Sequence, residues 1–89
     1  MITYKKVRYN KKTMYEILVT NNSNNINYAS VYLISNYFKI KLRQLFEVCN
    51  TYDDTFFVKN KLYTKDKETA NKIINQLTAL SLLNQLKNY

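Results

Sequence analysis

The chain of 89 residues has no glycine, no proline, no histidine and no tryptophan, and it has a single cysteine. Without glycine, the positive-φ positions of tight turns fall to asparagine and aspartate, which tolerate that backbone region best after glycine. Thirteen asparagines are available for this purpose. We therefore expect loops where they gather, at Asn10, 21–27, 50–54 and Asn60.

The missing histidines remove the most common general base and the most common metal ligand. Cys49 has no partner for an intramolecular disulfide, which fits a reducing compartment. It falls on an apolar seam, so we predict an inert core thiol rather than a nucleophile. We expect no enzyme, no catalytic residue, no cofactor and no metal site. The acids that could bind a divalent ion in principle are Asp53, Asp54, Asp66 and Glu68.

Long apolar runs are also missing. The longest uncharged stretch, residues 73–86, is too short and too polar to span a bilayer. The first ten residues are basic but lack the apolar run of a signal peptide. With 46% apolar residues, the sequence predicts one folded domain over residues 1–89, in the cytoplasm, or in that of the host cell if the chain is viral.

Positive charge is the strongest feature that remains. The net charge is +8, from twelve lysines and two arginines against six acids. Such a balance suggests nucleic acid, an anionic membrane or an acidic protein as partner. The alternative is codon bias, because lysine, asparagine and tyrosine all have AT-rich codons. An excess of lysine is a weaker indicator of nucleic-acid binding than an excess of arginine, because arginine binds phosphates and bases with two parallel hydrogen bonds.

Alternating apolar residues predict a β-hairpin at the start of the chain. We expect strands at residues 2–9 and 13–20, joined by a two-residue turn at Asn10-Lys11. That turn places Val7 opposite Met14 and Lys5 opposite Glu16. Five cations and no acid lie in this region before Glu16: Lys5, Lys6, Arg8, Lys11 and Lys12.

The cations are interleaved with Tyr4 and Tyr9, an arrangement that suits phosphates beside stacked bases. The alternative is a solvated edge strand that lysines protect from aggregation.

The middle of the chain predicts helix from about Tyr28 to Asn50, in one of two forms. In the first, one continuous helix carries an apolar seam at three- and four-residue spacing. In the second, the helix breaks near Lys39, and no glycine or proline decides between them.

After a turn at 50–54 we expect strands at 55–58 and 61–63, then a helix capped by Thr64 that runs to about Leu86. One side of that helix is apolar and is formed by Ala70, Ile73, Ile74, Leu77, Leu80 and Leu83. The predicted fold is α+β: a β-hairpin, a helix or helix-turn-helix, a second hairpin and a C-terminal helix, with the helices against one face of a small antiparallel sheet.

Residues 31–48 resemble the helix-turn-helix DNA-binding units. Ser35 occupies the small position of that pattern, and Lys39 stands where the family usually has glycine. The five apolar positions of the pattern hold Ile34, Phe38, Ile40, Leu45 and Val48.

The resemblance implies that residues 41–50 form a recognition helix, with Lys41, Arg43 and Gln44 facing bases. Leu42 and Phe46 also point outward; packing on the sheet would favour the continuous helix instead. The following hairpin would be a wing whose Lys59 and Lys61 touch phosphates, or else an ordinary sheet hairpin.

The whole layout is similar in style to small proteins of phages and mobile elements, which include regulators and anti-CRISPR inhibitors. The main expectation is a nucleic-acid-binding regulator, with DNA as the favoured ligand; it requires the hairpin cations and Arg43 to share one face. One alternative is an inhibitor of a host nucleic-acid-processing protein, with Leu42, Phe46, Leu82 and Leu86 as interface. Others are a subunit of a larger assembly, or a homodimer closed by the leucine-rich helix end.

Overall fold

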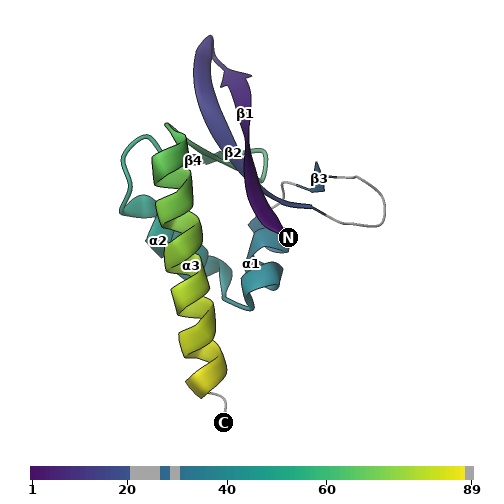
Figure 1. Ribbon diagram of the computed structural model, residues 1–89, viewed down its shortest axis with the longest axis vertical. Helices are drawn as coiled ribbons and strands as arrows, with labels where there is room; N and C mark the ends of the chain where they lie inside the picture. Colours follow the sequence, from purple (N-terminus) through teal and green to yellow (C-terminus); the bar gives the residue numbers. More distant parts are fainter. Residues whose placement is uncertain (21–26, 29–30, 88–89) are drawn as a thin grey trace.

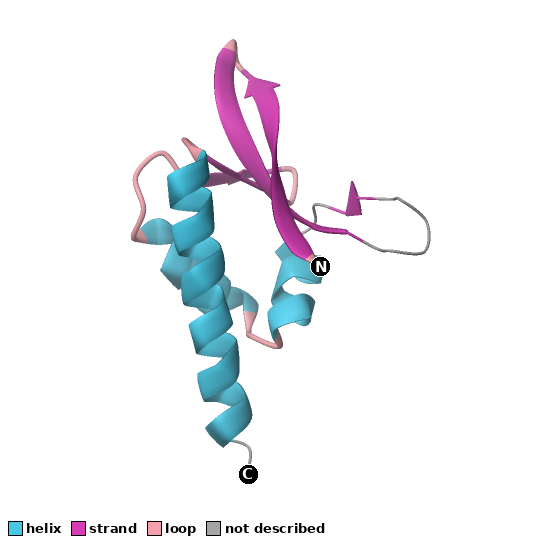
Figure 2. Cartoon of the chain, viewed as in Figure 1, coloured by secondary structure: helices cyan, strands magenta, loops and turns pink. Residues whose placement is uncertain are grey.

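Three helices cover one face of an antiparallel sheet (Figures 1 and 2). The computed structural model describes residues 1–20, 27–28 and 31–87. In chain order the elements are β1 (Ile2–Tyr9), β2 (Lys12–Thr20), β3 (Asn27–Tyr28), α1 (Val31–Phe38), α2 (Leu42–Asn50), β4 (Phe56–Val58), β5 (Lys61–Thr64) and α3 (Lys67–Lys87). The predicted α+β class and the order of its elements are confirmed, and β3 is an additional strand.

The β1–β2 hairpin has the predicted register. Val7 pairs with Met14 and Lys5 with Glu16, and the ladder runs from Ile2–Val19 to Tyr9–Lys12. The turn residues Asn10 and Lys11 have φ values of 49° and 65°. Two positive values match a type I′ turn, whose twist fits that of the flanking strands. The tip of this hairpin extends well beyond the helices (Figure 1).

The strand order is β1-β2-β5-β4, and β3 also pairs with β2. Because β1 occupies one edge of β2 along its length, β5 and β3 share the other edge, at residues 15–17 and 19–20 of β2. Asn27–Tyr28 is therefore strand, and the predicted helix start at Tyr28 is wrong; α1 begins at Val31. The predicted polar loop at 21–26 lies outside the described residues.

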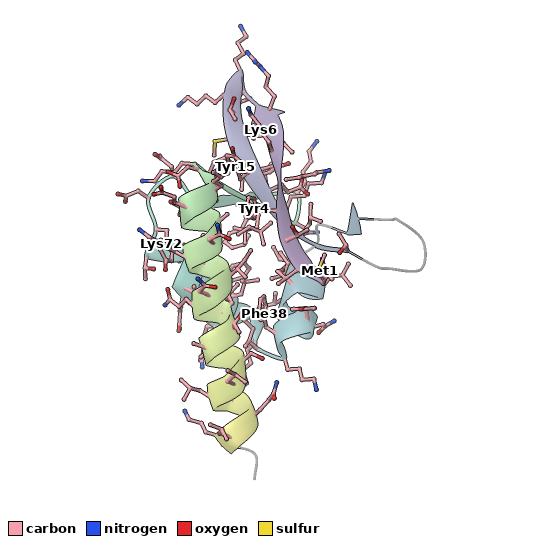
Figure 3. The ribbon with its side chains drawn as sticks, in the orientation of Figure 1. Met1, Tyr4, Lys6, Tyr15, Phe38 and Lys72 are labelled. Atoms are coloured by element: carbon pink, nitrogen blue, oxygen red, sulfur yellow. The ribbon has the colours of Figure 1, made fainter. Side chains whose placement is uncertain are left out.

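The core lies between the sheet and the three helices. From the sheet it receives Ile17 and Leu62, both with no exposed surface. Tyr4 and Tyr15 pack edge to face beside these residues, with ring centroids 5.7 Å apart, between the hairpin and the helices (Figure 3). The helices contribute Val31, Ile34, Phe38, Ile40, Leu45, Val48, Cys49, Ala70, Ile73 and Leu77.

The middle helix breaks at Lys39, so the continuous-helix interpretation is wrong. Lys39 has a φ of 56°, in the left-handed region, and the Ile40 amide donates to the Ser35 carbonyl at 3.0 Å. The break turns both helices onto the same core. All five apolar positions of the helix-turn-helix pattern are buried, and so is Ser35 at its small position.

The face of the sheet opposite the helices has its own buried side chains. Met14, Glu16 and Leu18 alternate with the core-facing residues of β2, and all three are buried. Tyr63 of β5 pairs with Glu16 and lies on the same face. Its ring stacks on that of Tyr9, with centroids 5.1 Å apart and planes at 24°. The sheet is thus packed on both faces near the middle of β2.

The last helix starts later than predicted. Thr64 is the final residue of β5, fully buried, with its hydroxyl 2.8 Å from that of Thr55. Asp66 caps α3 instead, because its carboxylate accepts the Thr69 backbone amide at 2.7 Å. The hydrogen bonds from Thr69 lower the pKa of Asp66 below its ordinary value.

The apolar side of α3 also ends earlier than predicted. Ala70, Ile73 and Leu77 are buried, but at the next turns Ser81 is the buried residue and Leu83 is 54% exposed. The core-facing side therefore continues through Ser81, while Leu83 joins Leu82 and Leu86, 57% and 68% exposed, on the surface. This part of α3 extends beyond the sheet toward the C-terminus (Figure 1).

We predict that Lys11→Gly stabilises the protein by roughly 0.5 kcal/mol. Glycine removes a left-handed penalty of about 1–2 kcal/mol, partly offset by its own entropy cost of about 0.5–1 kcal/mol. The free energy of unfolding in urea measures this change. Lys61→Gly, an exposed strand position, is the control and should destabilise; a loss of stability in both variants would contradict the turn geometry.

Leu45→Ala and Leu83→Ala should differ sharply in stability. Leu45 has no exposed surface, so its truncation should cost about 2–5 kcal/mol. Leu83 is more than half exposed, and its truncation should stay within about 0.5 kcal/mol. Thermal or urea unfolding compares the two variants. Similar losses would show that the end of α3 belongs to the core after all.

Candidate nucleic-acid interface

The turn between α1 and α2 builds the first part of a basic surface. Lys39, Ile40 and Lys41 connect the helices, and the backbone of Lys41 is extended with a φ of −79° and a ψ of 150°. Lys41 stands at the N-cap, where an ammonium group cannot accept the amides of the first turn. The amino end of α2 therefore combines the positive end of its dipole with a lysine on each side of Ile40.

A concavity of about 400 Å³ opens at this turn. The far end of α3 forms its opposite wall, because α2 and α3 run antiparallel: Gln44 meets Asn84 near one end, and Tyr52 meets Gln76 near the other. Four of its seven lining residues are cations and none is an acid. The lining consists of Lys39, Ile40, Lys41, Arg43, Gln44, Asn84 and Lys87. We call this group of residues the basic concavity.

Among the residues of the basic concavity with a described contact, Arg43 is the most weakly held. Its side chain is 78% exposed and lies 3.8 Å from the Glu47 carboxylate, one helical turn away. An exposed ion pair of this kind contributes little to the stability of the protein, and salt screens its attraction. An incoming phosphate can therefore displace Glu47 at small cost, and the arginine fork then binds it with two hydrogen bonds.

Gln44 has a structural role that the sequence did not suggest. Its side-chain oxygen accepts the Lys41 backbone amide at 3.0 Å and the Asn84 amide group at 3.1 Å. Both bonds hold the turn and the two walls in place. Gln44 is half-buried, and both bonds use its side-chain oxygen, so its predicted contact with bases stays a prediction that only its side-chain amide nitrogen could serve without breaking them.

The two large hydrophobes of α2 pack on the protein itself. Leu42 is partly buried against the core, and the ring of Phe46 meets Phe57 of β4 edge to face, with centroids 4.8 Å apart. The sequence argument linked such packing to a continuous helix, and that link is wrong because the helix breaks regardless. Leu42 and Phe46 are thus poorer interface candidates than the exposed Leu82 and Leu86.

The cations of the hairpin lie elsewhere. All five are exposed, but the alternation of the strands divides them: Lys6 and Arg8 lie on the face that carries the helices, and Lys5 and Lys12 on the other. Tyr4 and Tyr9 likewise lie on opposite faces, and Tyr4 packs on Tyr15. The predicted single surface of cations and stacking rings is therefore not formed along β1.

The hairpin tip and the basic concavity occupy opposite ends of a molecule 47 Å long. Figure 1 shows the tip of β1–β2 at the top and the carboxyl end of α3, which carries Lys87, at the bottom. Four of the six acids lie in the α2–β4 turn and at the start of α3: Asp53, Asp54, Asp66 and Glu68. The prediction of one continuous positive face that includes Arg43 is wrong.

The β4–β5 hairpin is tied to the helices rather than projecting as a wing. Its turn residues Lys59 and Asn60 have φ values of 50° and 66°, and the Asn60 carbonyl accepts the Val31 amide at 2.8 Å. The turn thus holds the start of α1. This contact favours the ordinary sheet hairpin, although Lys59 and Lys61 remain exposed.

Sequence reasoning missed two of the four cations of the basic concavity. Lys39 was considered only as a departure from a turn glycine, and Lys87 was not considered. The sequence shows that the last turn of α3 is basic. Lys87 reaches the basic concavity only because α3 lies antiparallel to α2, and no local pattern specifies that arrangement.

Other kinds of site find no support in the described part of the chain. Residues 1–20, 27–28 and 31–87 hold no group of three or more Cys, Asp or Glu side chains placed to bind a metal ion. No helix within those ranges has the length and apolar character needed to cross a membrane.

No protein-family model, curated protein or solved structure matches the chain.

We predict that the Cys49 thiol is unreactive in the folded protein. It is fully buried, and the loss of hydration raises its pKa from 9.0 to about 12. A raised pKa means less thiolate at pH 8, by about 1000-fold, so labelling with an aromatic disulfide reagent should be correspondingly slow. Urea-unfolded protein is the control and should react at once. Fast labelling of the native protein would contradict the burial of Cys49.

Proposed function

We propose that this protein binds nucleic acid, with DNA as the favoured ligand, through the basic concavity and the exposed side of α2. The supporting observation is that Lys39, Lys41, Arg43 and Lys87 surround one hollow with no acid among its lining residues. Four cations around one hollow suit phosphate groups, whose contacts supply a large share of the affinity in such complexes.

The helix arrangement is compatible with the helix-turn-helix resemblance. Lys39 adopts the left-handed conformation that the turn glycine of that family provides. On the exposed side of α2, Arg43 is the residue best suited to a guanine edge, and Lys41 stands at the N-cap two residues before it. The proposed role is a small non-enzymatic regulator of the phage or mobile-element type, acting in the cytoplasm.

The expectation from sequence required the hairpin cations and Arg43 to share one face; because they lie apart, the present proposal rests on the basic concavity alone. The hairpin cations lie at the other end of the molecule and line no part of the basic concavity. The proposal assigns them only a share in the long-range field of a protein with net charge +8, which speeds the approach of any polyanion.

A protein-binding inhibitor of a host nucleic-acid-processing enzyme is the second candidate. The observation that favours it is the row of exposed leucines Leu82, Leu83 and Leu86 at the projecting end of α3. A stoichiometric protein partner that survives nuclease treatment would distinguish this function from DNA binding. The same row would serve a homodimer, which light scattering at high concentration detects.

The DNA proposal predicts a steep salt dependence that the basic concavity controls. Four phosphate contacts give a slope of about −3.6 in log affinity against log salt, or a loss of roughly 100-fold between 50 and 200 mM KCl. Fluorescence anisotropy with a 25-base-pair duplex measures this slope. The variant Lys41→Ala/Arg43→Ala should bind more weakly and retain only about a 10-fold loss over the same range.

The matched control is Lys67→Ala/Lys72→Ala, which removes the same charge from exposed positions near the start of α3 (Lys72 is labelled in Figure 3). We expect it to keep a slope close to that of the wild type. Equal effects of both double variants would assign binding to net charge rather than to the basic concavity. Undetectable binding at 50 mM KCl would refute the DNA proposal.

A further inference from the structure

A second concavity lies at the other end of the molecule, between the tip of the β1–β2 hairpin and the start of β4. Its volume is about 380 Å³, and its lining includes Tyr9, Met14 and Phe56 together with Lys12, Lys65 and Asp54. We call it the tip concavity. It shares no residue with the basic concavity, so the two can be tested separately.

The aromatic wall of the tip concavity is fixed before any ligand binds. Tyr9 and Phe56 have centroids 5.5 Å apart, and both rest on the buried ring of Tyr63 at 5.1 and 5.7 Å. Met14, 6% exposed, closes the apolar part. Rings held by their neighbours lose little entropy when a flat ligand stacks on them, so this wall suits a planar heterocycle.

Within the described ranges the charged groups at the tip concavity form no ion pair, since the one found there is Arg43–Glu47. Lys12 and Asp54 are thus available to a ligand, and so is Lys65, whose ammonium group also attracts the neighbouring Asp66 carboxylate. Two lysines suit a phosphate group. A carboxylate accepts hydrogen bonds only, so Asp54 suits a ring that presents an amino group. The Asp54 backbone, with a φ of 53°, lies in a region that asparagine also tolerates.

We propose that the tip concavity binds a single unstacked nucleotide whose base carries an exocyclic amino group. The base stacks on one of the two rings, because the planes of Tyr9 and Phe56 are inclined by 47° to each other. Its amino group donates to Asp54, and its phosphate contacts Lys12 and Lys65. A volume of about 380 Å³ lies at the lower end of small-molecule sites, which fits one nucleotide. This inference goes beyond the duplex binding proposed for the basic concavity and does not depend on it.

Amide chemical shifts of the ¹⁵N-labelled protein test the tip concavity. CMP and UMP form the matched ligand pair, because cytosine has the amino group and uracil has a carbonyl in its place. We expect Thr13, Met14 and Phe56 to shift with both ligands, and CMP to bind about five-fold more tightly. Ribose 5-phosphate, which has no base, should bind much more weakly than either.

Two variants test the roles proposed for Asp54 and for the two lysines of the tip concavity. Asp54→Asn keeps the backbone geometry and should remove the preference for CMP over UMP. Lys12→Ala/Lys65→Ala should weaken both nucleotides by about ten-fold, while the exposed-lysine control Lys67→Ala/Lys72→Ala should not. Duplex binding at the basic concavity should be unchanged in all three, so failure of one proposal leaves the other standing.

Several results would overturn the inference: no shifts at the tip concavity with millimolar CMP, equal affinity for CMP and ribose 5-phosphate, or equal affinity for CMP and UMP in the wild type. A four-nucleotide cytidine oligomer identifies the source of the nucleotide. Binding more than ten-fold tighter than CMP would support the site as one for single-stranded nucleic acid, and binding equal to CMP would support it as one for free nucleotides.

Discussion

At Lys39 the backbone enters the left-handed region for one residue, and the position of α2 depends on that reversal. Because the chain turns there, Leu45 and Val48 reach the same core as Ile34 and Phe38. The turn also sets α2 antiparallel to α3, which brings Gln44 to Asn84 and leaves the basic concavity between them. A continuous helix would carry residues 42–50 away from α3, and neither the hydrogen bond nor the concavity would exist.

The features predicted from sequence are those encoded locally. Alternation over residues 2–20 and the two-residue turn at Asn10-Lys11 were sufficient to give the hairpin register. The five apolar positions of the helix-turn-helix pattern are buried as expected, and the burial of Cys49 followed from the apolar seam at three- and four-residue spacing. These patterns hold because each residue's environment is set by neighbours within a turn or across a short hairpin.

The predictions that were wrong concern where an element or a side chain lies in the tertiary structure. The cap of α3 moved from Thr64 to Asp66 because β5 extends through Thr64 and buries it against Thr55. Leu83 is exposed because α3 projects past the end of the core, and no periodicity shows where a core ends. The cations were expected on one face, yet the strand alternation and the length of the molecule divide them between two ends. Net charge in a sequence therefore says little about the field at any one point.

Lysines occupy left-handed turn positions that glycine would normally fill, and one of these lysines lines the basic concavity. Six residues in the described part of the chain have positive φ, and three of them are lysines: Lys11, Lys39 and Lys59. A lysine at such a position costs stability that glycine would avoid, about 1–2 kcal/mol for the conformation itself. The Lys39 side chain adds a cation to the wall of the basic concavity, so replacing it by glycine would relieve the backbone while removing one of four positive charges from the proposed phosphate site.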